Sequence, residues 1–116
     1  DIERIAVNMM DSMNPDNDGF HPQEQPIIND GISAYFSNVP VKALKDALLK
    51  MNIPSKVSNS AGLYVCNCAY YHALSEIYEK GLSTKSVFVH LPKISDDFSI
   101  ELLVKSIKKI IEEIIN

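Results

Sequence analysis

Two cysteines and a histidine are the residues of this sequence whose types and spacing could do chemistry. Cys66 and Cys68 lie in the stretch SAGLYVCNCAY, directly after a turn of small residues, and His90 ends the apolar run KSVFVH. At the start of a helix, free backbone N–H groups and the helix dipole favour a thiolate over a thiol. An imidazole within hydrogen-bond reach could hold that thiolate as an ion pair and protonate a leaving amine. The pattern therefore suggests nucleophilic catalysis by Cys66, with His90 as the proton carrier.

The same residues also have ordinary structural interpretations. A cysteine beside an apolar helix is more often a small buried hydrophobe than a nucleophile, and His90 could be a core histidine. Cys68 points about 200° away from Cys66 around a helix, so we expect Cys68 to pack. The Cys-x-Cys spacing and this divergence argue against a thiol redox site. Structural zinc is disfavoured, because His21, His72 and His90 are scattered singly.

A catalytic imidazole also needs a carboxylate or amide that fixes its tautomer. The residues alone do not choose this partner. The candidates are Glu3, Asp11, Asp16, Asp96 and Asp97.

The elements that must position these side chains follow from hydrophobic periodicity and turn residues. Strands are predicted in IERIAVN, around 56–59 and in KSVFVHLP up to His90. Helices are predicted over 40–52, 63–81 and 99–116. The first and the last are amphipathic, and the last is capped by Ser99. Their alternation implies right-handed βαβ crossovers and an α/β fold with a mainly parallel, doubly wound sheet and helices on both faces. Ligands collect at the carboxyl ends of such strands, where Cys66 and His90 both fall.

Length and charge limit the classes of function. A chain of 116 residues with 46% hydrophobic residues predicts one domain, residues 1–116. The net charge of −4 argues against nucleic-acid or membrane-surface partners. No apolar run approaches the roughly 20 residues that span a bilayer, and no basic-then-apolar leader opens the chain, so we expect a soluble, cytoplasmic protein. The Pro-, Asn-, Asp- and Gly-rich segment 9–33 is expected to be a long loop that covers something.

Several motifs together resemble pyroglutamyl peptidase I, also called pyrrolidone-carboxylate peptidase, a family of cysteine peptidases. VSNSAGLYVCN resembles the nucleophile motif of that family, SVFVHLP the segment of its catalytic histidine, and IERIAVN the segment of its catalytic glutamate. NPDNDG, EQPI and AYFSNVPVKAL extend the similarity up to Pro92. The resemblance implies a triad of Cys66, His90 and Glu3.

The resemblance also implies a function and partners. It implies hydrolysis of the amide bond after an N-terminal pyroglutamyl residue, so the partners would be N-terminally pyroglutamylated peptides. It implies assembly into homo-oligomers, and neither cofactor nor metal. The chain would be the C-terminal portion of a pyroglutamyl peptidase-like domain, without the N-terminal strands and Gly-Phe-rich loop of the family.

The sequence departs from the family at several positions. Met13, in DSMNPDN, stands where the family has an arginine near the active site, and Lys93 and the stretch SDD replace a tyrosine and Pro-Glu-Gln after His90. These changes affect substrate recognition more than the triad. The alternative is a catalytically impaired or truncated relative retained as a binding or assembly protein, and the loss of the arginine at Met13 favours it.

Overall fold

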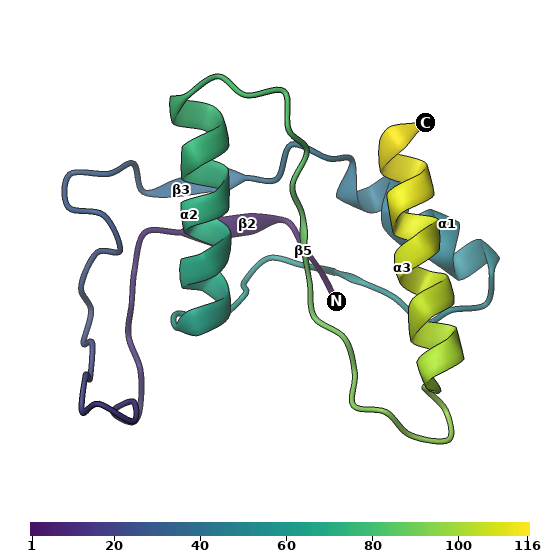
Figure 1. Ribbon diagram of the computed structural model, residues 1–116, viewed down its shortest axis with the longest axis horizontal. Helices are drawn as coiled ribbons and strands as arrows, with labels where there is room; N and C mark the ends of the chain where they lie inside the picture. Colours follow the sequence, from purple (N-terminus) through teal and green to yellow (C-terminus); the bar gives the residue numbers. More distant parts are fainter.

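Five short strands and three helices make up the chain, and a computed structural model describes all of its residues, 1–116 (Figure 1). The two longest elements are the helices Val65–Glu79 and Ile100–Ile115. None of the helices combines the length and apolar character needed to cross a membrane. In chain order the elements are β1 (Ile2–Glu3), β2 (Ile5–Val7), β3 (Ala34–Phe36), α1 (Val41–Lys50), β4 (Val57–Ser58), α2 (Val65–Glu79), β5 (Phe88–Val89) and α3 (Ile100–Ile115).

The strands form two small sheets. In the first, β1 lies between β4 and β5. It pairs in parallel with β4, where Ile2 lies opposite Val57, and antiparallel with β5, where Glu3 lies opposite Phe88. In the second sheet, β2 and β3 pair antiparallel. The predicted α/β class is confirmed, but the pairing is mixed rather than mainly parallel.

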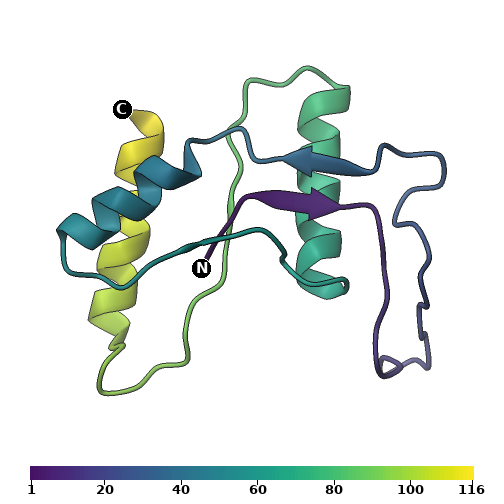
Figure 2. The same cartoon turned by 180° about the vertical axis from the view of Figure 1, so that it is seen from behind.

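The chain reaches β5 through α2 and residues 80–87. The axis of α2 crosses β2 and β3 in both views (Figures 1 and 2). Residues 80–87 then lead the chain into β5 against the direction of β1. A simple βαβ unit would have placed this strand parallel to β1.

Two local predictions can be compared directly with the structure. The cap of α3 is confirmed, because the Ser99 side chain accepts a hydrogen bond from the Leu102 N–H at 3.2 Å. Strand β3 was not predicted. Its three residues, Ala34–Phe36, are too few to show an alternating pattern, and pairing with β2 is what makes them a strand.

The structure has two hydrophobic cores. The first core joins α1, α3 and β1, and the second joins α2 to β2 and β3. Ile2 of β1 belongs to the first core, and Ala6 of β2 belongs to the second. Residues 2–7 therefore connect the two halves of the chain (Figure 2).

The segment 9–33 is the predicted long loop, and it extends beyond the β2–β3 pair (Figure 1). Its base is closed by the Asn8 side chain. Asn8 Oδ1 accepts hydrogen bonds from the N–H groups of Ile27 and Ile28, while Nδ2 donates to the carbonyl of Ile28 at 2.9 Å. Gly31 is required close by, because a Cβ there would lie 2.7 Å from the Tyr71 hydroxyl.

The first core makes a testable prediction about α1. Leu44 is 1% exposed and Leu49 of the same helix is 45% exposed. Leu44→Ala should lower the free energy of unfolding by about 2–5 kcal/mol, because it leaves a cavity, while Leu49→Ala should change it by less than about 0.5 kcal/mol. Urea denaturation followed by circular dichroism measures both. Equal losses in the two variants would contradict this assignment of the core.

Candidate active site

Pairing of β1 with β5 brings Glu3 and His90 together. Phe88 lies opposite Glu3, and His90 lies two residues further on, where its N–H donates to the Asp1 carbonyl at 2.9 Å. Side chains two residues apart on a strand share a face, so Glu3, Phe88 and His90 project from the same side of the sheet. His90 Nδ1 lies 2.8 Å from Glu3 Oε1. The contact therefore joins diagonal neighbours of an antiparallel strand pair.

Glu3 is an unusual residue to find at this depth. It is 1% exposed, and its Oε2 atom is buried without a hydrogen bond. A half-satisfied buried carboxylate costs free energy, so stability does not explain the choice of residue. With Glu3 ionised, its carboxylate can only accept a hydrogen bond, and Nδ1 of His90 is then the donor in this pair. The Nε2 atom of His90 is then the ring nitrogen left for other partners.

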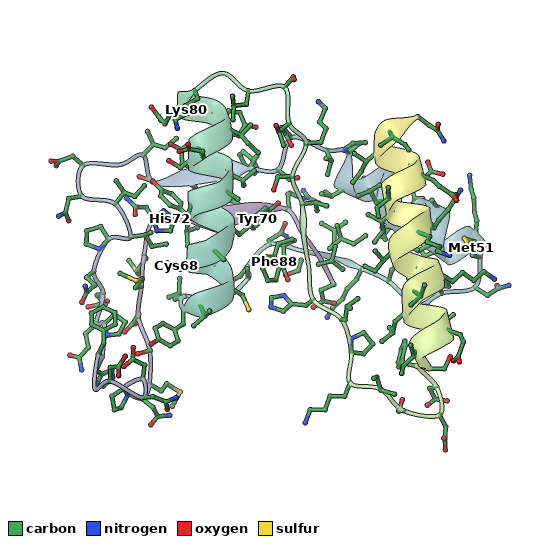
Figure 3. All side chains as sticks on the ribbon, viewed as in Figure 1. Met51, Cys68, Tyr70, His72, Lys80 and Phe88 are labelled. Carbon is green, nitrogen blue, oxygen red and sulfur yellow. The ribbon has the colours of Figure 1, made fainter.

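Tyr70 of α2 contacts the strands that carry this pair. Its hydroxyl donates to the Glu3 carbonyl at 3.0 Å, and its ring centroid lies 5.8 Å from that of Phe88. The Phe88 ring in turn lies 4.9 Å from the His90 ring. Burial raises the pKa of Tyr70, which therefore stays a neutral donor. Figure 3 shows Tyr70 and Phe88 adjacent, projecting from α2 and β5.

Helix geometry gives the position of Cys66 along the axis of α2, which can be compared with that of His90. Cys66 is the second residue of α2, one turn before Tyr70, and it is half-buried. It lies about 40° from Tyr70 around the axis and about 6 Å nearer the helix N-terminus. The β5 segment runs opposite to α2 (Figure 1), so His90 lies about 7 Å beyond Phe88 in the same direction. From the Tyr70–Phe88 contact, Cys66 and His90 are thus displaced equally toward the start of α2.

The start of α2 carries unused hydrogen-bond donors. The backbone N–H groups of Val65, Cys66 and Asn67 have no acceptor within the protein, and the N-cap residue Tyr64 provides no side-chain cap. Such donors and the positive end of the helix dipole favour negative charge at this position. Both the free N–H groups and the helix dipole would stabilise a thiolate of Cys66 or an oxyanion that develops beside it.

The remaining sequence candidates lie elsewhere. Cys68 and His72 project from the side of α2 away from Tyr70 and Phe88 (Figure 3), as the expected divergence of the two cysteines requires. His21 contacts the Ser12 carbonyl within the long loop. Of the candidate carboxylates, Glu3 is the one hydrogen-bonded to His90. No group of three or more metal-ligating side chains is found.

Two residues of this region were not identified from the sequence. Tyr70 was assigned to the apolar helix, although its spacing of four from Cys66 marks it as a neighbour on the same face. Asn67 was not singled out at all. It is 1% exposed, and its side chain hydrogen-bonds to the backbone of β2. A polar residue inside a predicted apolar helix, next to a candidate nucleophile, was the available signal.

Comparison with known proteins defines the class as a cysteine peptidase family of α/β fold. The family model for pyroglutamyl peptidase matches residues 1–114, and the chain belongs to this family. The resemblance seen in the sequence motifs is thereby confirmed.

Individual relatives agree in sequence and structure. The pyrrolidone-carboxylate peptidase of Thermococcus kodakarensis is 47% identical over 91 residues, which cover 78% of this chain and 44% of the relative. That of Thermococcus onnurineus is 41% identical, covering 96% of this chain and 60% of the relative. The structure of the Pyrococcus furiosus pyrrolidone carboxyl peptidase superposes with a TM-score of 0.91 at 35% identity, covering 98% of this chain and 61% of that one. The chain therefore spans about half to three fifths of its relatives' length.

The Glu3–His90 contact predicts a defined imidazole tautomer. In the neutral ring of the unaltered protein the proton should reside on Nδ1, whereas Glu3→Gln should give a mixture, because an amide can either accept or donate. Ring ¹⁵N shifts in a long-range ¹H–¹⁵N spectrum measure this. Exposed His72 is the internal control and should not change. An unaltered Nδ1–H population in the variant would mean that Glu3 does not orient His90.

Proposed function

We propose that this chain carries the catalytic residues of a pyroglutamyl peptidase and cleaves the amide bond after an N-terminal pyroglutamyl residue. Cys66 is the nucleophile, His90 transfers the proton, and Glu3 orients His90. The observation that carries the proposal is the 2.8 Å contact of His90 Nδ1 with a carboxylate that is 1% exposed. The substrate class is inferred from relatives named pyrrolidone-carboxylate peptidase.

The reaction follows from these roles. Nε2 of His90 takes the proton of the Cys66 thiol. The sulfur then attacks the pyroglutamyl carbonyl carbon, and the charge that develops on the carbonyl oxygen meets the free N–H groups at the start of α2. The carbon–nitrogen bond then breaks, and His90 Nε2 gives its proton to the departing amine. Water attacks the resulting thioester while His90 accepts a proton from it. The carbon–sulfur bond breaks, and pyroglutamate leaves as the free acid.

Burial supports the role of Glu3. A carboxylate enclosed beside the imidazole stabilises the imidazolium form in an environment where screening by water is weak. The Tyr70 hydroxyl holds the backbone of Glu3 at 3.0 Å, so the strand cannot turn the carboxylate away from His90. This arrangement is costly for stability and useful for proton transfer.

A second candidate is a relative that binds or assembles without turnover. Met13, at the position of the arginine in the resembling family, is 94% exposed in the long loop and offers no charge to a substrate. The matched relatives are also substantially longer than this chain. Under this alternative the triad geometry would persist without a complete substrate pocket.

Turnover and thiol labelling separate the two candidates. The chain should release a fluorogenic amine from a pyroglutamyl-amide substrate, and Cys66→Ser should lower kcat by at least about 10³-fold. Cys68→Ser is the matched control, because it alters the other thiol of the same helix, and it should leave kcat within about twofold. Loss of turnover in both variants equally would contradict the assignment of the nucleophile.

Labelling remains informative if the chain has no turnover. Iodoacetamide should alkylate Cys66 faster than Cys68 if the site favours a thiolate, and mass spectrometry resolves the two adducts. Absent turnover with preferential labelling of Cys66 would favour the binding relative. Absent turnover with equal labelling would refute the nucleophile.

A further inference from the structure

The side chain of Asn67 completes the free edge of β2. Its Oδ1 accepts a hydrogen bond from the Val7 N–H at 2.9 Å, and its Nδ2 donates to the carbonyls of Val7 at 2.8 Å and Met9 at 3.3 Å. On the other edge, β2 is occupied by β3. One amide side chain therefore serves Val7 as a neighbouring strand would, by both accepting and donating.

The location of this contact ties it to Cys66. Asn67 directly follows Cys66 in the first turn of α2, where no side chain caps the helix. Helix ends fray unless something holds them. Tyr70 attaches the next turn to the Glu3 carbonyl. The two attachments join the start of α2 to residues 3–9, the same stretch that carries Glu3.

We infer that Asn67 is a positioning residue, which sets the Cys66 sulfur relative to the Glu3–His90 pair by holding the first turn of α2 against β2. This inference rests on the proposed role of Cys66. Displacements of about 1 Å at a reacting atom can cost about 10²-fold in rate, so a hold of this kind affects chemistry as well as folding. Without Asn67, the Tyr70 contact remains, but the turn that carries Cys66 loses its own attachment.

Three variants separate positioning from simple stability. Asn67→Leu keeps the side-chain size and removes all three hydrogen bonds. Asn67→Gln keeps both hydrogen-bonding groups but holds them about 1.5 Å further from the helix. Tyr71→Phe is the matched control, because Tyr71 lies one turn beyond Asn67 on the buried side of α2 and donates to the Ile32 carbonyl at 2.7 Å.

The readout is the rate of iodoacetamide alkylation of Cys66 relative to Cys68, measured on the full chain across pH 5.5–8.5, together with kcat and KM for the pyroglutamyl substrate. Both Asn67 variants should lower the Cys66 preference by at least about fivefold and reduce kcat more than they raise KM. Tyr71→Phe should leave the preference and its pH profile within about twofold, even where its melting temperature falls. If Asn67→Leu does not fold, Asn67→Gln decides alone.

The outcomes distinguish this inference from the proposed function. A wild-type preference for Cys66 that persists in folded Asn67→Leu or Asn67→Gln overturns the positioning role and leaves the nucleophile intact. Absence of any preference in the wild-type chain overturns both. A Tyr71→Phe variant that loses the preference as fully as the Asn67 variants shows general loosening of α2, and it also overturns the inference.

Discussion

The hydrogen bond between Glu3 and His90 is the interaction on which the rest of the site depends. It exists because β1 and β5 pair antiparallel, so that residues two positions apart on neighbouring strands meet diagonally on one face. A shift of one residue in that register would turn the side chain of the shifted strand to the opposite face, away from its partner. The buried aliphatic side chains on that opposite face, such as Ile2, oppose such a shift. The first hydrophobic core therefore maintains the geometry of the Glu3–His90 contact from the opposite face of the strand.

Residues 2–9 act as the organising segment of the molecule. Ile2 enters one core, Glu3 faces the other side, and Ala6 packs under α2. The backbone of the same segment receives the hydrogen bonds of Tyr70 and Asn67. Two segments that are distant in sequence, β5 and the start of α2, are thus both attached to residues 2–9.

Much of this arrangement could be predicted from sequence, and the failures have physical causes. Apolar periodicity located the three helices, and the Ser99 cap was correct. The mixed strand pairing was not predictable, because the direction of β5 depends on the path of the chain between β4 and β5 rather than on any local pattern. Similarly, β3 exists only through its pairing. Glu3 could not be chosen from five carboxylates by pattern, since the contact with His90 spans 87 positions and depends on register. The choice of Glu3 came from the resemblance to the pyroglutamyl peptidase family and not from a local pattern.

Asn67 illustrates the limits of pattern-based reasoning most clearly. A polar residue on the buried face of a helix weakens the apolar pattern, so an analysis of hydrophobic periodicity gives no reason to single it out. In the fold it is the partner of an unpaired strand edge. Satisfying backbone groups is a three-dimensional requirement, and its solution can come from any part of the chain.

The central claim is that the thiol of Cys66 and the ring of His90 interact directly. A comparison of the His90 ring ¹⁵N signals of the wild-type chain and of Cys66→Ser, recorded under the same conditions, tests it most directly. The account predicts that the His90 signals move in Cys66→Ser while those of exposed His72 stay in place, because the thiol is a direct neighbour of the His90 ring. Superimposable His90 signals in the two proteins would contradict it.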